Sequence, residues 1–246
     1  MDINNRTVLI VGGTSGIGLG LARRFADAGS TVIVGGRTTG QVDGFESVVI
    51  DVTDADSVTS ARDEVLAAHP ELDVLVTMAG VMLVEDLRDP AHFAQTQQTI
   101  DVNLLGTIRV IDAFTPQLMS RGAADVITVT SGIAFLPFPL MASYAASKAG
   151  VHAYTEALRA QLAGTGIDVT ELVPPAVATA GQEKVNPAAL PLEGFFDEVI
   201  ALLSTDPTPH EVLVNGVLMH RWAEREGTYA ELVERRSQSL SSLPGR

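Results

Sequence analysis

Cysteine is absent from this chain of 246 residues, which excludes disulfide bonds, thiolate metal sites and cysteine nucleophiles. Basic side chains are scarce, because 16 Lys and Arg stand against 30 Asp and Glu, a formal net charge of −14. Such a surface repels a phosphate backbone and an anionic membrane face, so we expect neither nucleic acid nor a membrane as a partner. Aromatic residues make up only 5%, so the core must consist mainly of Ala, Val, Leu and Ile.

Long apolar runs are also missing. No stretch approaches the roughly 18 apolar residues of a membrane span. The run Val8–Val11 after the polar start is too short for the core of a signal peptide. We therefore expect a cytoplasmic protein. A content of 46% hydrophobic and 19% charged residues excludes disorder, collagen and coiled coil. It supplies one large core, so we predict a single domain over residues 1–246, although two domains are possible at this length.

Short apolar segments alternate with longer helical ones. The expected strands are mostly apolar without alternation, as in sheets covered on both faces. They are Thr7–Val11, Thr31–Gly35, Ser47–Ile50, Val74–Thr77, Asp125–Thr130, Ile167–Leu172 and Glu211–Val214. The expected helices are Ile17–Ala28, Asp56–Ala68, His92–Met119, Tyr144–Ala163 and Phe196–Ser204. This order predicts an α/β fold, a doubly wound parallel sheet of seven strands with helices on both faces, Rossmann-like in type. The connection between Gly36 and Ser47 is too short for a full crossover helix.

The first expected strand runs into a glycine-rich turn that opens the first helix, with the spacing Gly-x3-Gly-x-Gly. Glycines let the backbone approach a pyrophosphate, and the helix N-terminus supplies N–H donors and a positive dipole. No Gly-Lys-Ser/Thr follows, which excludes the phosphate loop of nucleotide triphosphatases. The alternative is a tight turn without a ligand. The residues expected to hold a dinucleotide here are Gly12, Thr14, Ser15, Gly16, Ile17 and Gly18.

The end of the second strand bears on the choice of cofactor. Folds that prefer NAD place an acid about 20 residues after the glycine turn, to hold the ribose 2′-hydroxyl. Here that position is Gly36, followed by Arg37, whose guanidinium would pair with a 2′-phosphate. NADP is therefore predicted, with Thr38 adding a hydroxyl contact; a solvated arginine is the alternative. Asp51, before Val52, is placed to accept from the adenine amino group, or instead caps a turn.

A tyrosine and a lysine stand four residues apart at the start of an expected helix, at Tyr144 and Lys148, so they share one face. A nearby cation stabilises a phenolate, so we expect Lys148 to lower the pKa of Tyr144 from near 10 and to make it an effective acid or base. Ser131 follows a strand at its carboxyl end, where ligands of open α/β sheets collect. Its hydroxyl would donate to a substrate carbonyl while Tyr144 transfers the proton. The alternative is a tyrosine and a lysine that merely neighbour each other on the protein surface.

These motifs together resemble the short-chain dehydrogenase/reductase family, in its compact single-domain branch. The likeness extends from Thr7 to about Val214 and includes the glycine fingerprint and the Ser, Tyr and Lys described above. The family's helix-borne Asn, followed by a hydrophobic pair and Gly, has its match in Asn103–Gly106. The resemblance implies an NADP(H)-dependent oxidoreductase that interconverts a small-molecule carbonyl and an alcohol. It implies that Asn103 holds a water in a proton relay to Lys148, which also binds the nicotinamide ribose.

The resemblance also implies a homodimer or homotetramer, packed through the helices His92–Met119 and Tyr144–Ala163. One departure follows the fourth strand, where the family's Asn-Asn-Ala-Gly reads Thr77–Gly80. Ala79 and Gly80 keep the close approach to the adenosine side, whereas both amides are lost.

A second departure follows the sixth strand, where the family's Pro-Gly reads Pro174–Pro175. By resemblance, Pro174 lies beside the cofactor, and the Val177 backbone and the Thr179 hydroxyl hold the carboxamide. The sequence Pro174–Thr179 and the segment Trp222–Gly227 are similar to those of one subgroup of the family. It is typified by the oxidoreductase encoded with lipoteichoic-acid D-alanylation genes.

Other functions are less well supported. The five histidines are scattered without helical pairing, so no metal site is predicted, and no Gly-x-Ser-x-Gly elbow is present for acyl transfer. A non-catalytic NADP-binding sensor or structural protein is the main alternative. Apolar residues between Ser131 and Tyr144 suggest a pocket wall, ordinary core or a subunit contact. We expect a mobile lid over Ala180–Phe195 and a solvated helix face over Ala223–Arg236.

Overall fold

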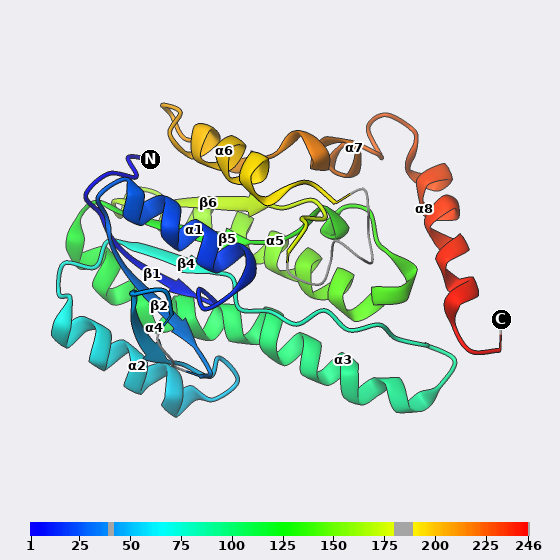
Figure 1. The fold of residues 1–246 in the computed structure, drawn as a ribbon, viewed down its shortest axis with the longest axis horizontal. Coiled ribbons are helices and arrows are strands. Elements are labelled where there is room, and N and C mark those ends of the chain that lie inside the picture. The colour runs from blue at the N-terminus through cyan, green and yellow to red at the C-terminus, as the bar shows by residue number, and fades with distance from the viewer. Residues whose placement is uncertain (39–41, 180–188, 246) are drawn as a thin grey trace.

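The computed structural model describes residues 1–38, 42–179 and 189–245. Seven parallel strands form one sheet in the order β3-β2-β1-β4-β5-β6-β7 (Figure 1). The strands are β1 Thr7–Val11, β2 Thr31–Gly36, β3 Glu46–Val49, β4 Val74–Thr77, β5 Ala124–Val129, β6 Ile167–Val173 and β7 Glu211–Leu213. The predicted doubly wound, Rossmann-like fold is confirmed. The strand order reverses between β1 and β4, which is where open α/β sheets bind their ligands.

Helices cover both faces of the sheet. They are α1 Gly16–Asp27, α2 Ala55–Ala68, α3 Phe93–Ile100, α4 Gly106–Arg121, α5 Ala142–Leu162, α6 Leu192–Leu203, α7 Leu218–Arg221 and α8 Tyr229–Ser237. Side chains of a strand alternate between its faces, so β1 feeds two cores. Val8 and Ile10 pack with α1 and α6, whereas Leu9 and Val11 pack with α2 and α4. Burial on both faces explains why the strands read as continuous apolar runs.

The single long helix expected over His92–Met119 is wrong. The segment begins with a 3-10 turn at Pro90–His92 and continues as α3, a π-helical turn at Asp101–Leu105 and then α4. Apolar spacing continues across the π turn, so the sequence pattern does not reveal it. Such turns often occur at functional sites, and this one contains the fully buried Asn103.

Two connections were predicted to be irregular. Between β2 and β3, the described residues Val42–Phe45 form a turn closed by the Phe45 amide on the Val42 carbonyl at 2.8 Å, and residues 39–41 lie outside the described part. The lid expected over Ala180–Phe195 falls mainly on residues 180–188, which are also outside it. Its last residues, from Leu192 on, belong to α6, so that helix begins four residues earlier than predicted.

The segment after β7 crosses to the far end of the molecule, where α8 stands beside the loop that joins β5 to α5 (Figure 1). Ala223 and Leu232 are buried there against Leu136 in a small separate core. The glutamates of Ala223–Arg236 are exposed, as a solvated face requires, whereas the opposite side of the segment docks through Ala223 and Leu232, with Tyr229 and Val233 packed beside them.

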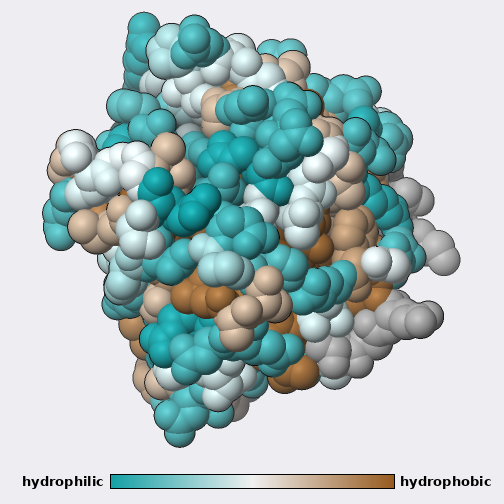
Figure 2. All heavy atoms as spheres, turned by 90° about the vertical axis from the view of Figure 1, so that its left-hand side faces the viewer, coloured by the Kyte–Doolittle hydropathy of each residue, from teal (hydrophilic) through white to brown (hydrophobic). Residues whose placement is uncertain are grey.

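The face seen from the left of Figure 1 carries mainly hydrophilic side chains, with apolar ones in small groups (Figure 2). This distribution agrees with the strongly acidic composition. Among the described residues, no helix combines the length and the apolar character needed to cross a membrane.

Candidate active site

A cleft of about 1350 Å³ runs along the carboxyl ends of the strands. It receives residues that end or follow β1, β2, β4, β5 and β6, together with the first turns of α1 and α5. Pockets for drug-sized ligands usually measure about 300–1,000 Å³, so this cleft has room for a longer molecule.

The glycine turn lies in the middle of the cleft and is packed too tightly for side chains. A Cβ on Gly12, whose φ is +93°, would lie 2.5 Å from the Ala79 amide nitrogen, and one on Gly18 would lie 2.2 Å from the Gly12 oxygen. Among the described residues, a Cβ on Gly16 would have only a Thr179 methyl within 4 Å. Helix α1 begins here with no acidic residue in its first turn. Its N-terminus is therefore suited to an anionic group such as a pyrophosphate.

Arg37, Asp51 and Val52, which were predicted to hold the adenosine part of a cofactor, all line the cleft. Arg37 is exposed and forms no ion pair with the described residues. One Asp51 oxygen accepts from the Thr53 amide at 2.9 Å and hydroxyl at 2.7 Å, and these bonds hold the pKa of Asp51 below its usual value. The turn-capping alternative thus describes the Asp51 side chain, although the residue still borders the cleft. Thr38 is exposed and is not among the lining residues.

The remaining predicted cofactor residues all line the cleft; they are Gly12, Thr14, Ser15, Gly16, Ile17, Gly18, Ala79, Gly80, Pro174, Val177 and Thr179. Sequence reasoning did not single out Met78 as a lining residue. It occupies the place of a family Asn, and its sulfur would lie 2.8 Å from a Cβ on Gly18. This thioether fills the space beside the glycine turn with apolar atoms.

The structure brings Ser131, Tyr144 and Lys148 together at the other part of the same cleft. Ser131 stands two residues after the end of β5, and its Oγ accepts from the Ile133 amide at 3.4 Å. Lys148 Nζ donates to the carbonyl of Val129 at 2.8 Å and lies 5.8 Å from the centre of the Tyr144 ring. A hydroxyl, a phenol and an ammonium therefore face one space, as their spacing predicted.

Burial dominates the protonation of this group. It raises the pKa of Tyr144 to about 12, opposed only in part by the Ser131 hydroxyl. It also lowers the pKa of Lys148 to about 8. The prediction that Lys148 lowers the pKa of Tyr144 is wrong in this structure, because burial raises that pKa and the group that opposes the rise is Ser131, whereas the Lys148 ammonium donates to the Val129 carbonyl. At neutral pH Tyr144 is a protonated phenol.

Asn103 lies in the π turn and braces the site. Its Oδ1 accepts from the Val81 amide at 2.8 Å, and its Nδ2 donates to the Val81 carbonyl at 2.9 Å and to Ser147 Oγ at 3.1 Å. A Cβ on Gly80 would lie 3.3 Å from this Oδ1 and 3.9 Å from Lys148 Nζ, so the two side chains are close. The side chain thus joins the loop after β4 to α5. The predicted role in a water relay stays a prediction.

Comparison with known proteins places this geometry in a family. Residues 6–189 match the family model described as short chain dehydrogenase. The chain belongs to the short-chain dehydrogenase family. The resemblance predicted from the sequence motifs is confirmed, and with it an oxidoreductase that uses a nicotinamide cofactor.

Individual relatives agree. An uncharacterized oxidoreductase, DltE, of Bacillus subtilis (strain 168) is 34% identical over 193 residues, which is 75% of this chain and 76% of DltE. Sulfoacetaldehyde reductase 2 of Chromohalobacter salexigens is 36% identical over 178 residues, 68% of this chain and 71% of the relative. A solved short chain dehydrogenase from Burkholderia cenocepacia J2315, in complex with NADP, superposes with a TM-score of 0.81 at 25% identity. That match covers 95% of this chain and 99% of the other.

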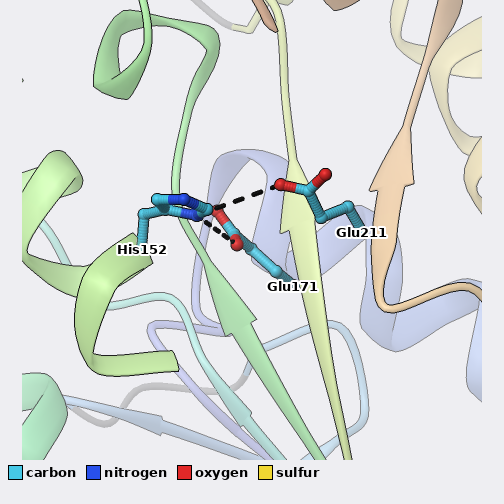
Figure 3. Close-up of side chains that lie close together, drawn as sticks. All are labelled: His152, Glu171 and Glu211. Carbon is cyan, nitrogen blue, oxygen red and sulfur yellow. Dashed lines mark hydrogen bonds and ion pairs between the residues drawn. The ribbon is translucent and has the colours of Figure 1, made fainter. Parts of the chain in front are cut away.

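An ion network joins His152, Glu171 and Glu211 in this short-chain dehydrogenase (Figure 3). His152, one turn after Lys148 on α5, bonds through Nδ1 to Glu171 Oε2 at 2.8 Å. The other oxygen of the fully buried Glu171 accepts from Thr130 Oγ1 at 2.5 Å, directly before Ser131 in the chain. The network therefore connects α5, the end of β5 and β6 at the point where Ser131 is positioned.

Glu211 on β7 completes this network. Its Oε1 lies 3.9 Å from His152 Nδ1, and both its oxygens accept from Arg221 Nε at 2.9 and 3.1 Å. Donor atoms of His152, Glu171 and Glu211 lie within 4.8 Å of one another, a spacing that a metal ion would tolerate. Arg221, Thr130 and His152 already satisfy the carboxylates, however, so the group is read as a charge-balanced network of side chains. The three residues are far apart in sequence, which hid them from sequence analysis.

His152 makes folding stability depend on pH. Its hydrogen bond to Glu171 raises its pKa above the ordinary value. A raised folded-state pKa gives stability that is fully present below about pH 6.5 and is lost as the pH rises through the folded value. We expect His152→Gln to lower the free energy of unfolding by about 1 kcal/mol more at pH 6 than at pH 9.

Chemical denaturation at the two pH values measures this difference. His210→Gln is a matched control, because the exposed His210 ring forms no ion pair with the described residues. An equal loss for His152→Gln at both pH values would show that the charge of His152 contributes nothing.

The sequence left open whether the apolar residues between Ser131 and Tyr144 form a pocket wall, ordinary core or a subunit contact. In the structure, different residues of this segment take different places. Ile133, Phe138 and Met141 line the cleft, as a pocket wall would. Leu136 is fully buried in the small core beneath α8, and Phe135 packs edge-on against the His152 ring at 4.8 Å between centres. Sequence analysis missed several polar cleft residues, among them His220 and Arg236 from α7 and α8. Both residues lie after the last strand, in short helices joined by irregular segments. Neither a motif nor a hydrophobic periodicity indicates a site in that part of the sequence.

Proposed function

We propose that this short-chain dehydrogenase is an NADP(H)-dependent oxidoreductase that interconverts a carbonyl compound and its alcohol. The observation that carries the proposal is the convergence of Ser131, Tyr144 and Lys148 on one cleft that also contains the glycine turn. The relative named sulfoacetaldehyde reductase 2 and the NADP complex from Burkholderia cenocepacia support both parts of it.

The residues of the cleft fit such a cofactor. The glycine turn and the N-terminus of α1 would hold the pyrophosphate, because Gly16 has no side chain to obstruct it and no acid in the first turn of α1 repels it. Arg37 would hold the 2′-phosphate, and Lys148 the nicotinamide ribose. When bound, the nicotinamide supplies or accepts the hydride.

The protein's own part of the chemistry is to move a proton. The Ser131 hydroxyl would donate to the substrate carbonyl oxygen and orient it. The Tyr144 phenol would then donate its proton to the same oxygen as negative charge develops there. Since burial raises the pKa of Tyr144 to about 12, the phenol holds its proton at neutral pH and is ready for carbonyl reduction. Oxidation of an alcohol requires the phenolate, so it is expected to gain with rising pH.

Absorbance at 340 nm with a panel of aldehydes and ketones tests the function directly. NADPH consumption that depends on the carbonyl compound is the expected result. Tight NADPH binding without turnover on any member of the panel would favour the alternative, a non-catalytic NADP-binding sensor or structural protein.

Cofactor preference gives a sharper prediction. Arg37→Ala should weaken NADPH binding about 10- to 100-fold and leave NADH nearly unchanged, because a charge-assisted contact to the 2′-phosphate contributes roughly 1.5–3 kcal/mol. Dissociation constants from fluorescence titration measure both. Arg121→Ala removes an equal charge from an exposed residue outside the cleft and should change neither. Equal losses for NADPH and NADH in Arg37→Ala would contradict the assignment.

We also propose a homodimer or homotetramer, formed through the α3–α4 segment and α5. Apolar exposure on that segment supports it, since Phe93, Leu105 and Met119 are 63%, 45% and 46% exposed. A symmetric contact between copies would cover them. The expected cytoplasmic location stays a prediction.

A further inference from the structure

Two polar side chains of the C-terminal segment reach the cleft near Ser131 and Tyr144. His220 at the end of α7 and Arg236 on α8 both belong to the lining. His220 is close to the catalytic strand end, because a Cβ on Gly132, next to Ser131, would lie 2.6 Å from His220 Nδ1.

Arg236 is held by backbone oxygens and has no anionic partner. Its Nη1 donates to the carbonyls of Leu136 and Pro137, on the loop between Ser131 and Tyr144. It forms no ion pair within the described residues, and its Nε and Nη2 donate to none of them. Burial lowers the pKa of Arg236, and the charge of Arg235 lowers it further. A half-buried guanidinium without a counter-ion is costly for the fold alone.

The acidic residues of the cleft are engaged elsewhere. Asp51 and Asp101 are its only acidic lining residues in the described part of the chain. Asp51 accepts from Thr53, and Asp101 pairs with Arg109 at 3.3 Å. Within residues 1–38, 42–179 and 189–245, neither of these acids therefore compensates Arg236, which lines the same cleft as Tyr144.

His220 adds a second unsatisfied group. Burial, together with the charge of Arg236, lowers the pKa of His220 to about 4, so the ring is neutral at neutral pH. Its Nδ1 is buried and has no hydrogen-bond partner among the described residues. Nδ1 is turned against Gly132, while the residue still borders the cleft, so His220 presents a neutral polar ring next to Arg236 and the guanidinium carries the charge recognition.

We propose that Arg236 and His220 form an anion subsite at the substrate end of the cleft. The substrate is then a carbonyl compound that carries a carboxylate, sulfonate or phosphate group a few atoms from the carbonyl. Arg236 offers the planar, multiple N–H donors that such groups prefer, and Ile133, Phe138 and Met141 provide an apolar wall for the carbons between the two ends. This inference rests on the proposed function for its carbonyl half only.

Matched substrates test it. Succinic semialdehyde, its methyl ester and butanal share a chain length and differ in charge, and aldehydes bearing a sulfonate or a phosphate show which anion is preferred. We expect the wild type to have a kcat/KM at least about 10-fold higher on one of the anionic aldehydes than on the neutral ones. Arg236→Gln should abolish that preference by raising KM for the anionic substrate about 10- to 100-fold. Because Arg236 also holds the Leu136 and Pro137 carbonyls of the cleft loop, butanal turnover is allowed a small general loss, and the loss on the anionic aldehyde should exceed it at least about 10-fold.

Arg235→Gln is the matched control, because it removes the same charge from the neighbouring exposed residue of α8. Arg236→Lys keeps the charge and should keep part of the preference, which separates charge recognition from docking of α8. Melting temperatures of all variants report whether α8 is displaced. A wild type that treats charged and neutral aldehydes alike would overturn the subsite. So would an Arg236→Gln enzyme that loses activity equally on both, or one that loses NADPH affinity.

Calorimetry keeps this test independent of turnover. Succinate should bind to the wild type and to Arg235→Gln in the presence of NADP⁺ and should fail to bind to Arg236→Gln. If no carbonyl compound is reduced but succinate binds in this pattern, the proposed function fails and the subsite stands. If the wild type reduces neutral carbonyls and neither binds nor prefers any anion, the subsite alone fails.

Discussion

Replacement of Tyr144 by phenylalanine is expected to lower turnover by about 10²- to 10⁴-fold, the range typical of lost general acid–base catalysis. The change removes one hydroxyl and keeps the ring, so the packing of α5 and the affinity for NADPH should survive. The loss should appear in kcat more than in KM, because the proton is transferred only as the carbonyl is reduced.

A second tyrosine on the same helix provides the control. The Tyr154 hydroxyl lies 3.4 Å from Asp112 and outside the cleft, so Tyr154→Phe makes the same chemical change away from the site. It should leave kcat within about two-fold of the wild-type value, since surface substitutions have small effects. Near-normal rates for Tyr144→Phe on an authentic substrate would refute the assignment of the proton donor.

Lys148→Met is expected to lower turnover and cofactor affinity together. The ammonium is buried and bonded to the Val129 carbonyl, and methionine of similar length replaces it without a charge. Turnover should fall at least as far as in Tyr144→Phe, because the positive charge 5.8 Å from the Tyr144 ring, which would face negative charge developing there during proton transfer, is lost together with the proposed ribose contact. The NADPH dissociation constant should rise about 10-fold.

The two variants are most informative side by side. Fluorescence titration of NADPH should separate them, with Tyr144→Phe unchanged and Lys148→Met weakened. A Lys148→Met protein that binds NADPH normally and is impaired only in kcat would remove the ribose contact from the proposal and leave the electrostatic role. The unpaired Val129 carbonyl is expected to reduce stability by about 1–3 kcal/mol, which thermal melts will register.

Sequence patterns predicted the fold and the glycine turn of the cleft, and each prediction has a clear physical reason. Strands buried on both faces, such as β1, must be continuous apolar runs, so their limits agree with the structure to within one residue. The glycine turn can also be recognised in the sequence, because the structure has no room for a Cβ at Gly12 and Gly18 and so requires glycine there. These features depend on neighbours in sequence or on backbone geometry.

The features that the sequence did not reveal depend on distant partners. The π turn at Asp101–Leu105 keeps an apolar rhythm that fits an uninterrupted helix. His152 and Glu171 are 19 residues apart and meet only through the sheet. The pKa of Tyr144 was predicted from one neighbouring charge, whereas the whole buried environment determines it.

The docking of the C-terminal segment has a consequence for how this protein and its relatives diverge. The match to the family model ends at residue 189, and α7 and α8 lie beyond it. The residues proposed to move the proton thus lie in the part that the family model matches, whereas Arg236 and His220 reach the cleft from beyond it. If the proposed subsite holds, exchanging α7 and α8 alone would alter which carbonyl compound is accepted and leave Ser131, Tyr144 and Lys148 in place.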